Sequence, residues 1–375
     1  MLMESFEVEN FRSLKHLKLD KLTRVNLLVG KNNSGKTSVL EGLVALLNTG
    51  DAGWISIIER ERGLAGSKAD FRYLFYGFDI GKVIKLSVTH REFTAHVASP
   101  MASFNVTITA QGKENKTPRS GLRNNLPTAP QWTATETLLI ALQLPTESKP
   151  FDFQLARTNR NKSYSVVPSE ETAKSFADGV NFMAASRHVI SEILTTNVNQ
   201  GLLSQKVETL RFNKSDGQVL LTMQAIDPRI KSIELGASGQ IYFDLGNDFR
   251  TLLPLNLMGE GIQRLLDVIT SIAHTAGGIV LIDEIDNGLH YSALRTLWKG
   301  VLQAAREYDV QVFATTHSAE ALRHLTWVLD DECKEYRDDV AAYTLIRADD
   351  DTVRSYRHDY GQLEYALEHG IEVRN

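Results

Sequence analysis

Residues 30–37 read G-K-N-N-S-G-K-T, a glycine-rich spacing that can hold phosphate groups. In such a loop successive backbone N–H groups point at the phosphates, and glycine permits a close approach that a Cβ would block. Lys36 is expected to reach the β- and γ-phosphate oxygens, and the Thr37 hydroxyl is expected to bind Mg²⁺. This segment, called the phosphate loop below, therefore predicts binding of ATP with Mg²⁺. The residues expected to contact the nucleotide are Gly30, Asn32, Asn33, Ser34, Gly35, Lys36, Thr37 and Ser38.

Two adjacent carboxylates, Asp283 and Glu284, follow the apolar run I-V-L-I at residues 279–282. Four consecutive apolar residues predict a buried central strand, which argues against an ordinary acidic patch on the surface. Such a strand delivers both carboxylates to the carboxyl edge of a sheet. We expect Asp283 to hold Mg²⁺ and Glu284 to orient or polarise the attacking water, as in-line phosphoryl transfer requires.

A histidine, His317, lies in the segment T-T-H-S at residues 315–318, where the next predicted strand ends. An imidazole at that edge can donate a hydrogen bond to the γ-phosphate and sense or stabilise it. The alternative is a structural histidine, but the order of the motifs along the chain favours the catalytic role. His290 follows Asp286 and suggests a metal site with Asp283, yet one histidine and scattered acids lack the ligand spacing of a zinc site.

The segment L-M-G-E-G-I-Q-R at residues 257–264, called the signature loop below, opens a predicted helix. The N-terminus of a helix attracts anions, so this one could bind a phosphate held by another subunit. Taken alone the segment is equally consistent with a glycine-rich helix start.

The elements around these motifs follow an α/β pattern at both ends of the chain. Strands are predicted around residues 6–18 and over 24–29, followed by a helix from Thr37 with apolar residues at i, i+3, i+4 and i+7. The last third predicts a strand over 278–282, a helix from Tyr291 and a strand over 310–315. It then predicts short strands over 342–347 and 352–357 and a closing helix around 362–368. This alternation is typical of a parallel sheet covered by helices.

The middle of the chain has a different pattern. Residues 71–110 alternate apolar and polar side chains as antiparallel strands do. Residues 111–131 are polar and basic and predict a mobile loop, for which a partner or nucleic-acid contact is the alternative to plain solvation. Residues 190–250 mix a helical stretch with strand candidates over 218–224 and 240–245. We therefore divide the chain into residues 1–110, an inserted α+β lobe over 111–250, and residues 251–375.

The composition excludes several classes of protein. The 375 residues are 42% hydrophobic and 23% charged, which is ordinary for a globular protein, and the formal net charge is -5. That charge leaves nucleic acid possible as a partner but does not indicate it. A single cysteine, Cys333, excludes an intrachain disulfide framework. With no signal peptide at the start and no apolar run of membrane-spanning length, we expect a cytoplasmic protein without a membrane partner.

The motifs, in their order along the chain, resemble the ATP-binding-cassette heads of SMC-like ATPases, and most closely the overcoming-lysogenization-defect (OLD) type. They are N-F-R-S at residues 10–13, the phosphate loop, the signature loop, the strand with its acid pair, and T-T-H-S. The resemblance covers roughly residues 1–50 and 250–330. It implies a P-loop fold of the ABC-ATPase head type, in which helices flank a mixed sheet that carries an antiparallel β subdomain.

The resemblance also implies a homodimer, or a larger assembly, in which two heads clasp ATP between them. Gly259, Glu260 and Gly261 would then contact ATP bound to the other chain, and His317 matches a switch histidine. Arg12 matches a position close to the phosphates. Met258 stands where transporter cassettes carry the signature serine, which puts that contact between chains in question, and His290 replaces the aspartate of their D-loop. The replacement at His290 looks like the OLD type and disfavours a transporter.

Three functions follow as hypotheses. OLD-type nucleases continue into a TOPRIM domain, for which the residues after Leu329 leave no room. We therefore expect a stand-alone ATPase that regulates a separately encoded effector, a nuclease or a toxin, in bacterial anti-phage defence. The alternatives are a repair or recombination ATPase similar to the RecF group, and a nucleotide-gated scaffold with little turnover, against which Glu284 argues.

Overall fold

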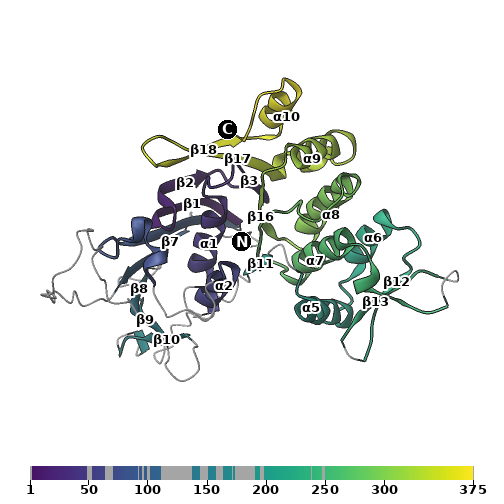
Figure 1. Cartoon of the computed structure of the whole chain (residues 1–375), viewed down its shortest axis with the longest axis horizontal. Helices are drawn as coiled ribbons and strands as arrows, with labels where there is room; N and C mark the ends of the chain where they lie inside the picture. Colours follow the sequence, from purple (N-terminus) through teal and green to yellow (C-terminus); the bar gives the residue numbers. More distant parts are fainter. Residues whose placement is uncertain are drawn as a thin grey trace, which may run out of the picture.

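A computed structural model gives the fold of the chain. The structure describes residues 2–48, 53–63, 71–91, 93–94, 97–98, 102–110, 137–143, 151–157, 164–170, 172–173, 191–194, 198–237, 239–246 and 250–374. The fold belongs to the α/β class, as predicted, with one mixed and one antiparallel sheet flanked by helices (Figure 1). In the part of the chain that is described, no helix combines the length and the apolar character needed to cross a membrane.

A six-stranded sheet forms the centre of the molecule, in the order β11-β15-β16-β3-β17-β18. Neighbours run parallel except for the last pair, β17 and β18. The three strands in the middle are buried at every position, as the nearly continuous apolar sequences of β3 and β15 and the apolar centre of β16 predict. Their carboxyl ends therefore meet at one edge. The strands are β11 (Ser191–Leu194), β15 (Ile279–Ile282), β16 (Gln311–Thr316), β3 (Val25–Val29), β17 (Val340–Arg347) and β18 (Val353–His358).

A seven-stranded antiparallel sheet lies beside it, in the order β10-β9-β8-β7-β4-β1-β2. The prediction of antiparallel strands within residues 71–110 is confirmed by the pairing of β4 with β7. The strands are β1 (Leu2–Phe11), β2 (Leu14–Asp20), β4 (Ile84–Arg91), β7 (Ala102–Ala110), β8 (Thr137–Gln143), β9 (Phe151–Arg157) and β10 (Tyr164–Pro168), and a separate hairpin joins β5 (Phe93–Thr94) to β6 (Val97–Ala98).

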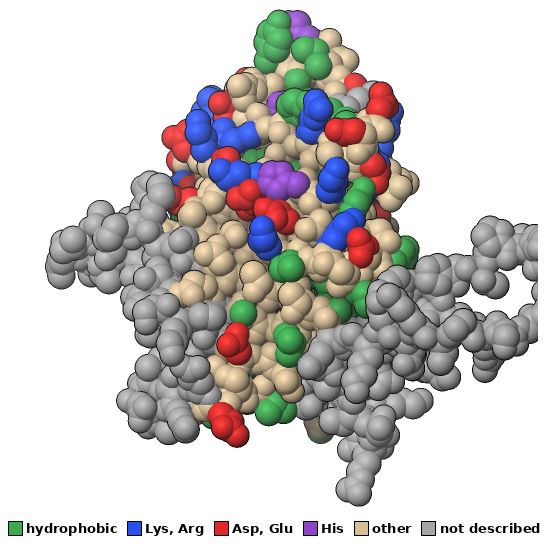
Figure 2. Space-filling view, turned by 90° about the vertical axis from the view of Figure 1, so that its left-hand side faces the viewer, with side chains coloured by type: hydrophobic (Ala, Val, Ile, Leu, Met, Phe, Trp, Pro, Cys, Tyr) green, Lys and Arg blue, Asp and Glu red, His purple; other side chains and the backbone are tan. Residues whose placement is uncertain are grey.

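The side of the molecule that bears this sheet carries charges of both signs. Figure 2 shows acidic and basic side chains interspersed in the upper part of this side. Lys85 pairs with Glu9 at 3.0 Å, and His16 lies 2.7 Å from Glu7. Such alternation creates no field of a single sign, so the described part of this face does not have the basic stripe that binds nucleic acid.

Helix α1 (Lys36–Leu47) fills the space between the two sheets, and the shorter α2 (Gly53–Glu61) packs next to it. Residues 38–46 of α1 are all buried. Their core cluster includes Phe6 of β1, Leu28 of β3 and Phe313 of β16. The helix therefore connects the phosphate loop rigidly to both sheets.

A group of helices covers the other face of the central sheet (Figure 1). It consists of α5 (Gln200–Phe212), α6 (Gly217–Ile226), α7 (Glu260–His274) and α8 (Leu294–Glu307), with a small sheet of β12 (Ser232–Leu235), β13 (Ile241–Asp244) and β14 (Leu253–Pro254). The predicted strand over 240–245 is confirmed by β13. The predicted strand over 218–224 is wrong, because these residues form α6.

The reason for that error is tertiary. In α6, Val219 and Met223 are buried four residues apart, and Thr222 packs against Gly300 of α8, where a Cβ would come within 2.7 Å of the threonine methyl group. Helix–helix packing stabilises a helix in a segment whose local pattern suits either structure.

The last two strands and the last helix of the chain agree with the prediction. After α9 (Ala319–Asp331), β17 and β18 form an antiparallel pair, and α10 (Tyr360–Glu368) closes the chain with a capping box at Asp359. The basic loop expected over 111–131 lies outside the described residues. Strands β8 to β10 extend the sheet that begins with β1. The division of the chain at residues 110 and 250 stays a prediction.

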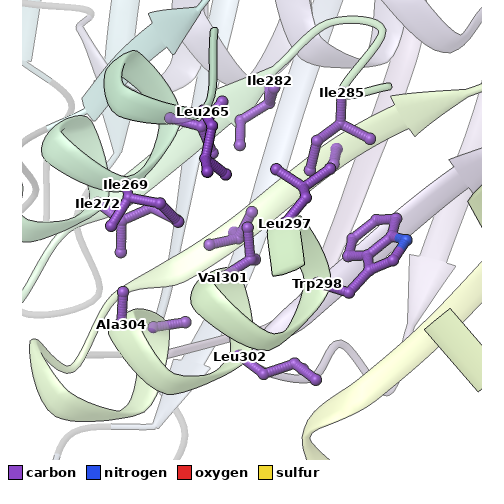
Figure 3. Packing of buried hydrophobic residues seen from close by; sticks show 14 of the residues in the cluster. Leu265, Ile269, Ile272, Ile282, Ile285, Leu297, Trp298, Val301, Leu302 and Ala304 are labelled. Carbon is purple, nitrogen blue, oxygen red and sulfur yellow. The ribbon is translucent and has the colours of Figure 1, made fainter. Parts of the chain in front are cut away.

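Apolar side chains of α7 and α8 pack against the carboxyl end of β15. Figure 3 shows Ile269 and Ile272 of α7 near Val301 and Ala304 of α8, with Ile282 of β15 above them. Trp298, on α8, is fully buried, and its Nε1 donates a hydrogen bond to the carbonyl of Ala321 at 2.8 Å. This packing holds the strand that bears the acid pair against the signature helix α7.

We expect the Trp298→Ala substitution to lower the free energy of unfolding by about 3–5 kcal/mol, because it leaves a large cavity and removes the hydrogen bond from the indole to the Ala321 carbonyl. Urea denaturation followed by circular dichroism measures the change. Trp327→Ala is the matched control, since that side chain is 50% exposed on α9 and its loss should cost less than about 1 kcal/mol. Equal losses in the two variants would contradict the assignment of Trp298 to the core.

Candidate functional site

The phosphate loop connects the end of β3 to the start of α1. Lys36 folds back over the loop, where its Nζ donates hydrogen bonds to the carbonyls of Gly30 at 2.7 Å and Lys31 at 2.9 Å. Burial lowers the pKa of Lys36, and the nearby carboxylates of Asp283 and Glu284 oppose that shift. The ammonium group therefore lies in a partly desolvated site that faces acidic side chains, where a phosphate can compete for it.

Two glycines give the loop its shape. Gly30 has φ +154°, and a Cβ there would lie 2.6 Å from the Leu345 carbonyl oxygen. Gly35 has φ +99° and caps α1, and its Cβ would meet a methyl group of Leu14 at 2.8 Å. The loop therefore packs against the strands too tightly to admit side chains at these positions.

Gly35→Ala should destabilise the protein by about 1–3 kcal/mol, because it forces an L side chain into a positive φ and a steric clash. Chemical denaturation measures the loss. Gly259→Ala is the control for stability, since Gly259 has φ −60° and no atom lies within 4 Å of the position that a Cβ would take there. A Gly35→Ala variant as stable as the wild type would contradict the positive φ of Gly35 and its close contact with Leu14.

The start of α1 offers hydrogen-bond donors that a ligand can use. No side chain caps its N-terminus at Gly35. Ser34 Oγ is buried and makes no hydrogen bond within the described part of the chain. A buried hydroxyl without a partner, next to uncapped N–H groups and an ammonium, is the donor set that phosphates need. These residues fit ATP. Asn32 and Asn33 are exposed at the top of the loop, and Ser38, whose Oγ lies 2.9 Å from Ser13 Oγ, is buried below it.

The structure brings Asp283 to the phosphate loop, as predicted from the strand pattern. Thr37 Oγ1 donates to Asp283 Oδ2 at 3.2 Å. On its other side Asp283 accepts a hydrogen bond of 2.5 Å from Thr315 Oγ1. A hydroxyl and a carboxylate at this separation fit the oxygen ligands that Mg²⁺ prefers, with the remaining positions open to water or phosphate.

Glu284 follows in a turn with a strained backbone. Its φ is +48°, and its N–H donates to Thr315 Oγ1 at 2.8 Å. The side chain is 41% exposed, and its Oε1 lies 3.9 Å from Nδ1 of His317, which is 53% exposed. Strain of this kind is held in place by the surrounding structure and gathers at functional sites. The predicted general base and the predicted switch histidine are therefore neighbours at the edge of the sheet.

Arg12 lies beside α1, where its guanidinium makes two hydrogen bonds to Glu41, of 2.8 and 3.0 Å. Arg62 also donates to this buried carboxylate at 2.7 Å. In the structure Arg12 thus ties the turn after β1 to α1. Its predicted contact with the phosphates stays a prediction.

The signature loop lies on the other side of the central sheet from α1 (Figure 1). Gly259 caps α7, and both Gly259 and Glu260 are exposed. Gly261 packs against residues 288–289, where its Cβ would be 3.3 Å from the Gly288 carbonyl oxygen. One chain therefore places its phosphate loop and its signature loop on opposite sides of the sheet, and the predicted contact of Gly259, Glu260 and Gly261 with ATP bound to a second chain stays a prediction.

His290 is exposed, and its Nδ1 lies 2.9 Å from Ser292 Oγ. That it is not a metal ligand stays a prediction. Asp286 accepts a hydrogen bond from Thr316 Oγ1 at 2.7 Å. Among the described residues, the one group of three side chains close enough to share a metal ion is Glu7, Glu9 and His16, on the antiparallel sheet.

Two residues of the site were not singled out from the sequence. Thr315 bonds both Asp283 and the backbone of Glu284, and Arg264 Nη2 donates to the Asp283 carbonyl at 3.0 Å. A signal existed for Thr315, because its hydroxyl directly follows the apolar residues 312–314 at the carboxyl end of a predicted strand. For Arg264 there was none, because a basic residue one turn into a helix normally faces water.

Two models of known protein families match this chain over segments that contain the motifs of the site. A family model described as "AAA domain, putative AbiEii toxin, Type IV TA system" matches residues 92–323, which is more than half of the chain and includes the acid pair and His317. A model described as "AAA ATPase domain" matches residues 1–121, which include the phosphate loop.

Individual relatives are distant. An ATP/GTP phosphatase of Helicobacter pylori is 25% identical over 391 aligned positions, covering 98% of each chain. A protein of Methanocaldococcus jannaschii, MJECL10, is 38% identical over 80 residues, which is 20% of this chain and 36% of that one.

Among the solved structures with the same fold are heads of SMC proteins. One is an SMC head bound to the C-terminal winged-helix domain of ScpA, with a TM-score of 0.55 and 11% identity, covering 98% of this chain and all of that one. Another is an Smc head with an extended coiled coil, bound to the C-terminal domain of ScpA from Pyrococcus furiosus, with a TM-score of 0.54 and 9% identity over 99% of both chains. At such low identity the likeness confirms the fold alone.

Proposed function

The chain belongs to the AAA-domain family whose model spans residues 92–323 and is an ATPase of the AAA and SMC-head type, and from this premise we propose that it works as an ATP-driven dimeric switch. ATP binding closes two copies around the nucleotide, and hydrolysis opens them. A separately encoded effector reads the closed state.

The contact between Thr37 and Asp283 carries the proposal. These residues are 246 positions apart in the sequence, yet their side chains meet at 3.2 Å above the phosphate loop. Thr37 and Asp283 would hold Mg²⁺, which supplies positive charge to offset the charge that develops on the phosphate oxygens. Lys36 would bind the β- and γ-phosphate oxygens from the side of the loop.

Glu284 is the proposed general base. It is half-exposed, so it can accept a hydrogen bond from a water placed in line with the γ-phosphate. His317 lies close enough to Glu284 to contact the same phosphate and to report its presence. The strained turn at Glu284 fixes the direction in which the carboxylate points.

The dimer is proposed from the geometry of α7. Gly259 leaves the N-terminus of this helix open, and Leu257 beside it is 72% exposed. Tyr291, at the start of the segment before α8, is 55% exposed. Apolar side chains around an uncapped helix start fit a surface that docks on the nucleotide site of a second copy. Met258 at the signature-serine position would leave the backbone N–H groups of Gly259 to Gly261 as the main donors to that phosphate.

The effector is proposed to be a nuclease or a toxin, and the setting to be defence of a bacterial cell against phage. The description of the matched family as a toxin of a toxin–antitoxin system supports an association with such effectors. The OLD type stays our proposal for the closest group.

Phosphate release by the purified protein, with and without DNA, tests this function. We expect slow basal hydrolysis whose rate per chain rises with protein concentration, because each site needs a second chain. Adding DNA should change this rate little. Strong stimulation by DNA would support a repair or recombination ATPase instead. ATP binding without turnover at any concentration would support a nucleotide-gated scaffold. Phosphate release by the Lys36→Ala variant, purified in the same way, gives the background rate.

A further inference from the structure

Three charged side chains that the mechanism above does not use are buried behind the acid pair. They are Lys206 on α5 and Arg264 and Asp267 on α7, and their side chains are 10%, 3% and 6% exposed. Burying a charge is costly unless it is paired, so the position of each depends on the others.

Their contacts run from α5 to the Asp283 carbonyl. Lys206 Nζ lies 3.5 Å from Asp267 Oδ1 and donates to Ser271 Oγ at 2.7 Å. The other oxygen of Asp267 lies 4.0 Å from Arg264 Nη1. Arg264 Nη2 then donates to the carbonyl oxygen of Asp283 at 3.0 Å. The Asp267 carboxylate thus links a lysine of α5 to an arginine that holds the turn at Asp283 and Glu284. This turn is called the catalytic turn below.

The peptide group between Asp283 and Glu284 is held from both sides. Its N–H, which belongs to Glu284, donates to Thr315 Oγ1, and its carbonyl accepts from Arg264. These two bonds oppose relaxation of the positive φ of Glu284, a conformation that is strained for an L residue. Relaxation would turn the carboxylate away from its present direction beside His317.

We propose that Arg264 is a positioning residue for ATP hydrolysis, and that Lys206, acting through Asp267, makes the catalytic turn sensitive to the position of α5. This inference rests on the proposed function of Glu284 as general base. It also gives the helical side of the molecule, with α5, α6 and β12 to β14, a physical connection to the rate of hydrolysis.

Hydrogen exchange in the absence of nucleotide tests the structural part. The Arg264→Lys variant keeps the buried charge and loses the forked donor, and Lys206→Gln keeps a partner for Ser271 and loses the charge. We expect amides of residues 283–289 to exchange at least about threefold faster in both variants. Lys299→Gln is the matched control, because it removes an exposed ion pair between Lys299 of α8 and Glu332 at the end of α9 and should leave residues 283–289 unchanged.

Steady-state hydrolysis tests the functional part. We expect Arg264→Lys to lower kcat by about tenfold to 100-fold while KM for ATP changes less than about twofold, because a misplaced base slows the chemical step and leaves binding intact. Lys206→Gln should lower kcat by a smaller factor. In the double variant the two factors should not multiply, since both act through one chain of contacts.

The outcomes separate this inference from the proposed function. Absence of hydrolysis by the wild type would remove the proposed function, and the exchange experiment would still decide whether Arg264 and Lys206 hold the turn. Normal exchange over residues 283–289 in both variants would overturn the inference. So would multiplicative effects on kcat, or a loss confined to KM in an active enzyme.

Discussion

The Glu284→Gln variant should bind ATP and hydrolyse it about 100-fold to 10,000-fold more slowly than the wild type, which is the usual contribution of a positioned general base. Glutamine has the same size, and the backbone bond from residue 284 to Thr315 Oγ1 does not depend on the side chain. Only the basicity of the group beside His317 is lost. Because ATP then persists in the site, a closed dimer should accumulate, and multi-angle light scattering in the presence of ATP and Mg²⁺ measures its mass.

Two comparisons make this test decisive. Glu307→Gln, an exposed residue at the end of α8, should hydrolyse ATP at the wild-type rate and form no trapped dimer. If Glu284→Gln bound ATP and stayed monomeric at every concentration, the closed dimer would be falsified. If it hydrolysed ATP at the wild-type rate, another group would have to be the base.

Lys36→Ala should weaken ATP binding by about 100-fold or more, since charged hydrogen bonds to phosphate contribute about 1.5–3 kcal/mol each. In the structure the ammonium group already lies over the loop, on the carbonyls of Gly30 and Lys31. Alanine removes the one side-chain cation among the residues of the loop that is partly buried and faces Asp283 and Glu284. Isothermal titration calorimetry with ATP and Mg²⁺ measures the loss.

Lys31→Ala is the matched control for this prediction. Lys31 lies in the same loop with an exposed side chain, so its removal should weaken ATP binding by less than about fivefold. Thermal unfolding without nucleotide should show both variants folded. Wild-type ATP affinity in Lys36→Ala would remove the assignment of residues 30–37 as the phosphate site.

The secondary structure around the motifs was predictable because it is fixed locally. Buried parallel strands are rich in apolar residues, and glycine is favoured where φ is positive, so β3, β15, the apolar centre of β16 and the loop at Gly35 leave a clear pattern in the sequence. The segment 218–224 leaves no such pattern. Its helix depends on packing against α7 and α8, which a local pattern does not contain.

By itself the sequence determined the chemistry of the site: a phosphate loop with Lys36 and Thr37, an acid pair at the end of an apolar strand, and a histidine at the end of the next. Only the tertiary structure decided which groups hold these residues in place. The neighbours of Glu284, namely Thr315 and Arg264, come from another strand and another helix, and the partner of Arg12 is Glu41 on α1. Hydrogen bonds and buried ion pairs form between residues far apart in the chain, so spacing along the sequence does not encode them.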